Sequence, residues 1–196
     1  MRHYFIDDPN LPDDFRTFQY YFMGHSFTFT SNSGVFSHGH VDPLSDLLIR
    51  TVPPLTGSLL DLGCGYGAIG IALCKAYSLS LTLADINPRA LYCAEINCRD
   101  NAVKCETITS DGFDGIPDKF ETITLNPPIH AGKDVVWRMF EQSIHHLYEG
   151  GRFCVVMLEK HGAKSAMKKL AEVYGHYEVL YKKKGEYIFC CTKNTT

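Results

Sequence analysis

Several features that mark membrane, secreted or multidomain proteins are missing from this 196-residue sequence. No apolar run approaches the roughly 18 residues that a membrane-spanning helix needs. Acidic side chains interrupt the opening segment at Asp7, Asp8, Asp13 and Asp14, so this segment does not resemble a secretory signal. No internal repeat or low-complexity linker is present. We therefore expect a cytoplasmic protein that forms a single domain over residues 1–196.

Cysteine is frequent, with eight residues, but no two are spaced as Cys-x-x-Cys. Paired spacing of that kind is typical of zinc sites, and its absence argues against one. His38 and His40 have no cysteine near them in the chain and so supply no alternative set of ligands. Most cysteines fall inside apolar segments, where cysteine behaves as a small hydrophobic residue. We expect reduced thiols in the core and no bound metal.

A large positive charge is also missing, since the net charge is −3, which is not typical of a general nucleic-acid binder. The charge is unevenly distributed, because residues 151–196 carry nine basic and four acidic side chains. The lysines of this segment lie near a predicted helix and in a predicted loop, at Lys160, Lys164, Lys168, Lys169, Lys182, Lys183 and Lys184. They form either a solvated surface or a patch that contacts phosphates.

The most informative segment is Leu59 to Gly70, which predicts a strand, a glycine turn and a helix. We expect the strand over 58–62 and the helix over 68–77. Three glycines at Gly63, Gly65 and Gly67 fill the turn. Such a turn lets the backbone approach a ligand closely at the carboxyl edge of a parallel sheet. Glycine turns of this type also open dinucleotide folds, so the pattern alone does not exclude NAD.

Two further strands are predicted to end on polar residues at the same edge. The strand over 81–84 ends on Asp85, whose carboxylate can accept hydrogen bonds from both hydroxyl groups of a ribose. The strand over 105–109 ends at Ser110, Asp111 and Gly112. The alternative is that these acids are ordinary loop carboxylates or helix N-caps.

A fourth strand is predicted over 120–125, and Asn126, Pro127 and Pro128 end it sharply because neither proline can donate to a sheet. The rigid turn presents the side-chain oxygen of Asn126 and the carbonyl oxygen of Pro127 as two fixed acceptors. An amino group with two protons fits such a pair. Holding both hydrogens orients the nitrogen lone pair for attack on an electrophilic carbon, which favours methyl transfer. The alternative is a plain strand-terminating turn.

The remaining elements alternate in the same way. We expect a helix over 134–148, a strand over 152–158, a helix over 163–174, and strands over 177–181 and 186–191 joined by a loop at 182–185. Ahead of the glycine turn, residues 15–30 predict a strand pair with a turn at Gly24 and His25. A helix is expected from its N-cap Asp42 to about Arg50.

Over residues 55–191, the glycine turn and the polar strand ends resemble class I S-adenosylmethionine-dependent methyltransferases. Four motifs sharpen the resemblance: His3-Tyr4-Phe5, Gly34-Val35-Phe36-Ser37, the run from Asn126 to Lys133, and the run from Gly162 to Leu170. They resemble the "methyltransferase small" domain, the catalytic domain of bacterial ribosomal RNA guanine-N2 methyltransferases. The resemblance implies an α/β fold, a Rossmann-like, mostly parallel seven-stranded sheet with a C-terminal antiparallel hairpin and helices on both faces. Residues 1–41 would form a small β-hairpin extension and residues 42–196 the catalytic core.

The resemblance also implies roles for individual residues. The turn would hold the methionine part of S-adenosylmethionine through Asp61, Gly63, Cys64, Gly65 and Gly67. Asp85 would bind the ribose, Ile86 would pack on the adenine, and Asp111 with Gly112 would lie at the adenine amino group. Asn126 would border both the cofactor and the substrate, and no metal is implied.

For the substrate, Asn126 and Pro127 would orient the amine and Pro128 would shape the turn. Families that methylate such amines usually place an aromatic residue where this chain has Ile129, which would press on the target base. His130 would supply a planar ring or a hydrogen bond, or else face solvent as a loop residue. Phe36 and Ser37 would line the entrance.

These inferences predict an N-methyltransferase that acts on the N2 amine of guanine in structured RNA, such as ribosomal RNA or a ribosomal particle. Two alternatives stay open. One is methylation of a protein glutamine amide, which uses the same two acceptors. The other is a non-catalytic module that binds the cofactor or RNA. The sequence gives no oligomeric state.

Overall fold

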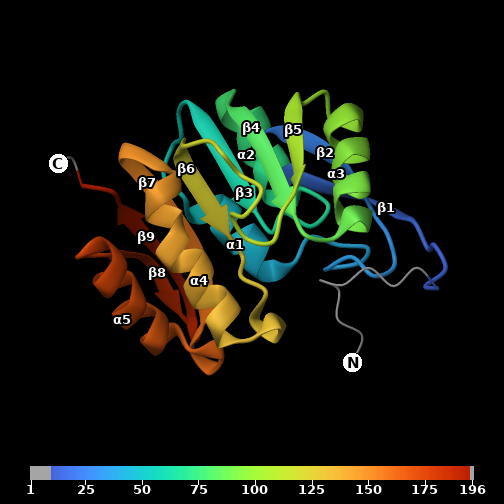
Figure 1. Cartoon of the computed structure of the whole chain (residues 1–196). Coiled ribbons are helices and arrows are strands. Elements are labelled where there is room, and N and C mark those ends of the chain that lie inside the picture. Colours follow the sequence, from blue (N-terminus) through green and yellow to red (C-terminus); the bar gives the residue numbers. More distant parts are fainter. Residues whose placement is uncertain (1–9, 195–196) are drawn as a thin grey trace.

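A seven-stranded sheet forms the centre of the computed structural model, which describes residues 10–194 (Figure 1). The strands lie in the order β5-β4-β3-β6-β7-β9-β8. Their bounds are β3 Ser58–Leu62, β4 Ser80–Asp85, β5 Cys105–Thr109, β6 Phe120–Leu125, β7 Leu147–Leu158, β8 Glu178–Lys183 and β9 Glu186–Thr192. Strands β3 to β7 pair in parallel, whereas β9 runs antiparallel to both β7 and β8. The predicted mostly parallel sheet with a C-terminal hairpin is confirmed.

Helices cover both faces of this sheet. Side chains along each strand alternate between two hydrophobic clusters, one on each face, and both clusters are buried by helices. In β3, Leu59 joins one cluster and Leu60 the other. Helices α1 (Pro43–Thr51), α2 (Ala68–Tyr77) and α3 (Pro88–Asp100) pack on the first face. Helices α4 (Lys133–Ser143) and α5 (Ala163–Tyr174) cover the second face, which is nearest the viewer in Figure 1.

The carboxyl ends of the central strands lie level with one another. Leu62 of β3 pairs with Ala84 of β4 and with Leu125 of β6. Asp85 pairs with Thr109. The residues that follow these pairs therefore gather along one edge of the sheet, which is where the polar strand ends were expected to meet.

The glycine turn leads into a helix that lies unusually close to the sheet. A Cβ atom added to Gly70 of α2 would lie 2.6 Å from Leu83 and 3.0 Å from the Cβ of Asp61. Real Cβ atoms essentially never come as near as the first of these distances. Only glycine permits this packing, so Gly70 fixes the position of the N-terminus of α2 above β3 and β4.

A separate two-stranded sheet, β1 (Arg16–Phe22) and β2 (His25–Ser31), packs against α3. Two asparagines of α3 take the place of a third strand. Asn97 accepts from the backbone N–H of Thr30 (2.7 Å) and donates to its carbonyl oxygen (2.9 Å), and Asn101 does the same at Thr28. These side chains satisfy backbone groups along the edge of β2 that does not pair with β1.

Several predicted boundaries need correction. The helix expected over 134–148 ends at Ser143, a 3-10 turn covers Ile144–His146, and Leu147 already begins β7. Leu147 is fully buried and pairs with Phe120 of β6, so burial is achieved in the sheet and not by another helical turn.

The two hairpin turns also differ from the prediction. Met23 and Gly24 form the first turn, not Gly24 and His25, and Lys184 and Gly185 form the second. In each turn both residues have positive φ, which matches the twist of the flanking strands in a two-residue hairpin. Lys182 and Lys183 therefore lie in β8 and not in a loop. The prediction did not name α3, and the His3-Tyr4-Phe5 motif falls outside the described residues.

All eight cysteines are free thiols, and seven of them are buried, as expected. Within residues 10–194, no helix has the length and apolar character that crossing a membrane requires.

Candidate active site

A pocket of about 280 Å³ opens at the carboxyl edge of β3, β4, β5 and β6. Ten of the predicted site residues line it: Phe36, Gly63, Gly65, Asp85, Ile86, Asp111, Gly112, Asn126, Pro127 and Pro128. The remaining wall is mostly apolar and includes Leu62, Ala90, Val135 and Met139. These apolar residues could not be predicted from the sequence, because similar side chains fill the core throughout. A mainly apolar pocket with a few converging polar groups is typical of a small-molecule site.

The glycine turn leaves open space on the pocket side. Gly63 and Gly65 both have positive φ, at 65° and 57°, and a Cβ added to either would meet no atom within 4 Å. Glycine is therefore needed here for its conformation and leaves the backbone open to a ligand. The assignment of this turn to the methionine part of a cofactor stays a prediction.

Asp85 connects this turn to the end of β4. Its Oδ2 atom accepts from the backbone N–H of Gly65 (2.8 Å), and its Oδ1 atom accepts from that of Asn87 (2.9 Å). Burial raises the pKa of the Asp85 carboxyl, and these backbone donors oppose the rise. Each carboxylate oxygen has a second lone pair, so the side chain can still accept two hydroxyl hydrogens from a ribose.

Asp61 does not line the pocket but lies beneath it, with 1% of its surface exposed. It accepts from the backbone N–H of Gly70 (2.9 Å) and from the hydroxyl group of Thr124 (3.2 Å). Burial is the main reason that the pKa of this carboxyl rises to about 7. These contacts join β3 to the start of α2 and to β6 beneath the pocket, and a direct contact of Asp61 with a cofactor stays a prediction.

The opposite end of the pocket suits a flat ring. Ile86 is 45% exposed and lines the pocket with Ala90 and Met139. Asp111 forms an ion pair with Arg138 of α4, at 2.6 Å between Oδ1 and Nη2. This ion pair engages one oxygen of Asp111, so the second remains to meet an amino group.

The side chain of Asn126 is held in one orientation by α1. Its Nδ2 atom donates to Oδ2 of Asp42 (3.1 Å) and to Oγ of Ser45 (3.0 Å). The same Asp42 oxygen caps α1 by accepting from the backbone N–H groups of Leu44 and Ser45, each at 3.0 Å. A carboxylate can only accept, so the amide nitrogen must face Asp42 and the Oδ1 atom must face away. The sequence predicted Asp42 as an N-cap but gave no sign that it orients Asn126.

The turn after Asn126 has the rigid form that two prolines favour. The carbonyl oxygen of Pro127 accepts from the backbone N–H of Ile129 (2.8 Å), which leaves its second lone pair for another donor. Ile129 lines a second cavity and does not line the pocket with Asn126. His130 is exposed and likewise does not line this pocket. Their predicted contacts with a base stay predictions.

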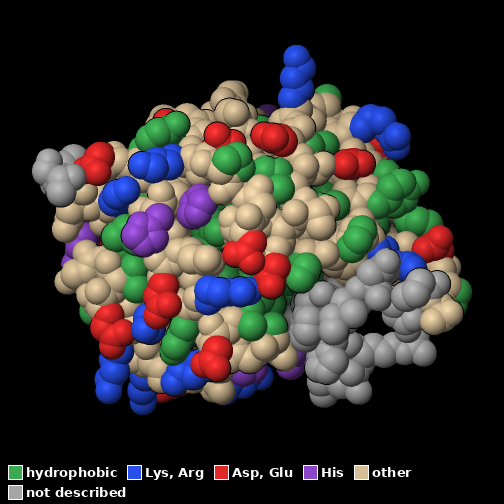
Figure 2. Space-filling model, viewed as in Figure 1, with side chains coloured by type: hydrophobic (Ala, Val, Ile, Leu, Met, Phe, Trp, Pro, Cys, Tyr) green, Lys and Arg blue, Asp and Glu red, His purple; other side chains and the backbone are tan. Residues whose placement is uncertain are grey.

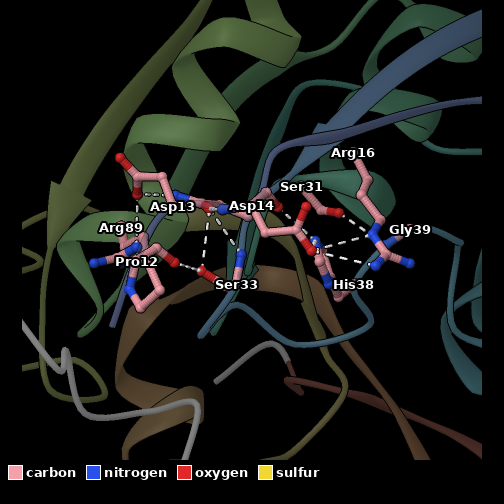
Figure 3. Close-up of polar contacts among 10 residues, drawn as sticks. Pro12, Asp13, Asp14, Arg16, Ser31, Ser33, His38, Gly39 and Arg89 are labelled. Atoms are coloured by element: carbon pink, nitrogen blue, oxygen red, sulfur yellow. Dashed lines mark hydrogen bonds and ion pairs between the residues drawn. The ribbon is translucent and has the colours of Figure 1, made fainter. Parts of the chain in front are cut away.

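Phe36 lines the pocket from the loop between β2 and α1. Figure 3 shows polar contacts that join this loop to the N-terminal segment, such as Ser33 with Pro12 and His38 with Asp14. Asn32 of this loop donates to Asp13, which pairs with Arg89 of α3 at 2.7 Å. On the other side of the loop, the His38 Nε2 atom lies 2.7 Å from the carbonyl oxygen of Asp14. The loop is therefore held near both ends, at Asn32 and at His38, by contacts with the N-terminal segment.

A small recess adjoins the pocket where α1 meets the glycine turn. Cys64 lines it together with Ser37, Asp42 and Asn126. Gly67 is buried as the N-cap of α2 and lines neither space. Within residues 10–194, no group of three or more His, Cys, Asp or Glu side chains is arranged to hold a metal ion.

With this geometry established, comparisons identify the family. Residues 26–190 match the model of the methyltransferase small domain, and the chain belongs to that family. It is an S-adenosylmethionine-dependent methyltransferase, in agreement with the open glycine turn and the carboxylate of Asp85.

Relatives agree with this assignment. The chain is 38% identical to the uncharacterized protein YbxB of Bacillus subtilis, over 97% of this chain and 98% of that protein. It is 37% identical to the ribosomal RNA small subunit methyltransferase C of Pasteurella multocida, over 74% of this chain and 46% of the relative. The chain thus spans about half the length of the named methyltransferases that it matches.

A solved structure extends the similarity to the fold. The 16S rRNA N2 methyltransferase of T. thermophilus, in complex with AdoMet and guanosine, superimposes with a TM-score of 0.82 at 27% identity. The match covers 95% of this chain and 52% of that one. This similarity confirms the predicted Rossmann-like methyltransferase fold.

Proposed function

We propose that this methyltransferase modifies the exocyclic N2 amino group of a guanine in ribosomal RNA, in the cytoplasm. The observation that carries the proposal is the orientation of Asn126, whose nitrogen is bound by Asp42 and Ser45. The Oδ1 atom is then presented as an acceptor beside the free lone pair of Pro127, and both residues line the pocket that contains Asp85. Two adjacent acceptors match an amino group with two hydrogens.

For methyl transfer to a guanine amine, the protein must orient the amine toward the methyl group of the cofactor. The lone pair of a guanine amine is delocalised into its ring, so the nitrogen is a weak nucleophile. Two acceptors that hold both hydrogens localise the lone pair and aim it in one direction. S-adenosylmethionine supplies an electrophilic methyl group on a sulfonium. Gly63, Gly65 and Asp85 would hold it, and Asn126 would border both ligands.

A groove of about 710 Å³ lies beside α1. Asp42 lies in it, so the groove reaches the residue that orients Asn126. Lys160 and Lys184 line its other wall together with Glu159 and Glu186, so the two lysines can contact phosphates although the groove as a whole is not basic. The lysines of α5 are less suitable, because Lys164 lies 3.1 Å from Glu159, and Lys169 lies 2.8 Å from Glu141. Figure 2 shows basic and acidic side chains interspersed on the face of the molecule that α4 and α5 cover.

The names of the relatives support ribosomal RNA as the substrate, and the guanosine in the T. thermophilus structure supports guanine as the base. The test is transfer of a tritiated methyl group to small ribosomal subunits and to naked ribosomal RNA from a strain without the enzyme. Nucleoside digestion should yield labelled N2-methylguanosine. Label on a glutamine of a ribosomal protein would support the alternative substrate. Cofactor binding without transfer to either would support a non-catalytic module.

A further inference from the structure

Ile129 lines a second cavity, of about 210 Å³, between the first turns of α4 and α5. Its wall includes Trp137 of α4, Met157 at the end of β7, and His161 and Ser165 from the start of α5. This cavity plays no part in the cofactor site. Its composition nevertheless resembles a ligand site, since one large aromatic ring and aliphatic side chains meet a few polar groups.

Trp137 provides the aromatic face. It is half-buried, and its ring packs against the Phe140 ring with centroids 5.3 Å apart. The Nζ atom of Lys133 lies 5.4 Å from the centroid of the Trp137 ring. A cation beside a partly accessible indole is a common arrangement where a base stacks and its phosphate is neutralised.

Two polar groups in the cavity can recognise the edge of a base. His161 has a lowered pKa, chiefly because of burial and then because of the charges of Lys160 and His130. Its imidazole is therefore neutral at pH 7, with one donor and one acceptor nitrogen. The hydroxyl group of Ser165 can also donate or accept.

The cavity is separated from the site of methyl transfer. Helix α4 turns Val135 and Met139 toward the cofactor pocket, whereas Lys133 and Trp137 line the cavity. Asn126 is bound to α1 on the other face of the sheet. The 3-10 turn at Ile129–Ala131 lies between the two spaces. A base in the cavity and a base whose amine meets Asn126 would therefore occupy different spaces, because no described residue lines both.

We propose that this cavity binds a second nucleobase of the RNA, next to the nucleotide that is methylated. The base stacks on Trp137 and contacts Ile129, while Lys133 pairs with its phosphate. Charge complementarity favours this occupant, because Lys133 lines the cavity and no acidic side chain is among the described residues that line it. The inference rests on RNA being the substrate, as proposed above.

Trp137 is the only tryptophan of the chain, so tryptophan fluorescence reports on this cavity alone. Titration with a short single-stranded ribo-oligonucleotide should quench the emission in a saturable way. S-adenosylhomocysteine, which the other pocket would bind, should leave it nearly unchanged. Absence of saturable quenching by an oligonucleotide that the enzyme methylates would overturn the inference.

A variant that fills the cavity gives the second measurement. Ser165→Leu should raise KM for RNA about tenfold, which lies within the range that stacking of one base contributes, and should leave kcat and cofactor affinity within twofold. Ala171→Leu is the matched control, because Ala171 is exposed on the same helix, carries no charge and does not line the cavity. An unchanged KM in a folded Ser165→Leu enzyme overturns this inference alone. A wild-type enzyme that methylates no RNA overturns the proposed function and this inference with it.

Discussion

Asn126 and Asp42, 84 positions apart in the sequence, are joined by a hydrogen bond of 3.1 Å between Nδ2 and Oδ2. The same Asp42 oxygen caps α1. One carboxylate oxygen thus sets both the start of a helix and the direction of the amide at the strand end. The acceptor that the proposed reaction needs, Oδ1 of Asn126, is presented because the other end of the amide is occupied.

Asp42→Ala should therefore lower kcat for methyl transfer by about tenfold or more, since the amide loses its charged partner and can rotate. KM for the cofactor should change little. Loss of the cap should also cost about 1 kcal/mol of unfolding free energy. Steady-state kinetics and denaturant unfolding measure the two effects.

Asp42→Asn separates these roles, because asparagine caps helices as well as aspartate does and still offers one oxygen to Asn126. We expect its stability to match the wild type and its kcat to recover to within a few-fold. Equal kcat values for Asp42→Ala and the wild type would show that the contact does not orient Asn126 for the reaction.

Asp85→Ala should weaken cofactor binding by about 10- to 100-fold, because hydrogen bonds to a charged group contribute about 1.5–3 kcal/mol each. Calorimetry with S-adenosylhomocysteine measures the loss. An analogue without the ribose 2′-hydroxyl should bind the variant and the wild type more equally. Similar losses for both ligands would assign Asp85 to the Gly65 turn, to which it also bonds, and not to the ribose.

Asp61 should make stability depend on pH. Its pKa in the folded protein is about 7, above the ordinary 3.8, so between these values the folded state holds the proton more tightly than the unfolded state does. The free energy of unfolding therefore falls as pH rises through this window and levels off above about pH 7. Asp61→Asn removes this titration. Relative to the wild type, it should gain on the order of 2 kcal/mol between pH 5 and pH 8. A stability difference that stays constant with pH would contradict this account.

Asn97 should be important for stability although it lies outside the site. It is fully buried and bonds to both backbone groups of Thr30 and to the carbonyl oxygen of Tyr66 (2.8 Å). Asn97→Ala leaves these groups without partners and should cost about 2–3 kcal/mol in denaturant unfolding. Gln19→Ala, at an exposed position of β1, should stay within about 0.5 kcal/mol of the wild type. Equal effects of the two changes would mean that the asparagine does not anchor the hairpin.

The sequence predicted those parts of the fold that depend on local pattern. Helices α2 and α5 and strands β3, β5 and β6 have the predicted bounds, because alternation, glycine turns and prolines specify them locally. The end of α4 could not be predicted in this way. Leu147 continues the helical spacing, and only its pairing with Phe120 in the folded sheet places it in a strand.

The candidate site, like the fold, could be predicted only in part. Strand ends predicted the positions of Gly63, Asp85 and Asn126, since parallel strands bring their carboxyl ends together. Contacts between segments that are far apart in the chain could not be predicted from local sequence pattern. The bond from Asp42 to Asn126 and the position of Ile129 in the wall of a separate cavity depend on how α1, α4 and α5 pack on the sheet.

The most direct test of the account is methyl transfer by Asn126→Ala, measured together with its affinity for S-adenosylhomocysteine. Because the side chain supplies one of two acceptors for the amine, the variant should lose at least about 100-fold in kcat. Its cofactor affinity should stay within a few-fold of the wild type. Retained transfer, or loss of cofactor binding together with transfer, would contradict the role assigned to Asn126.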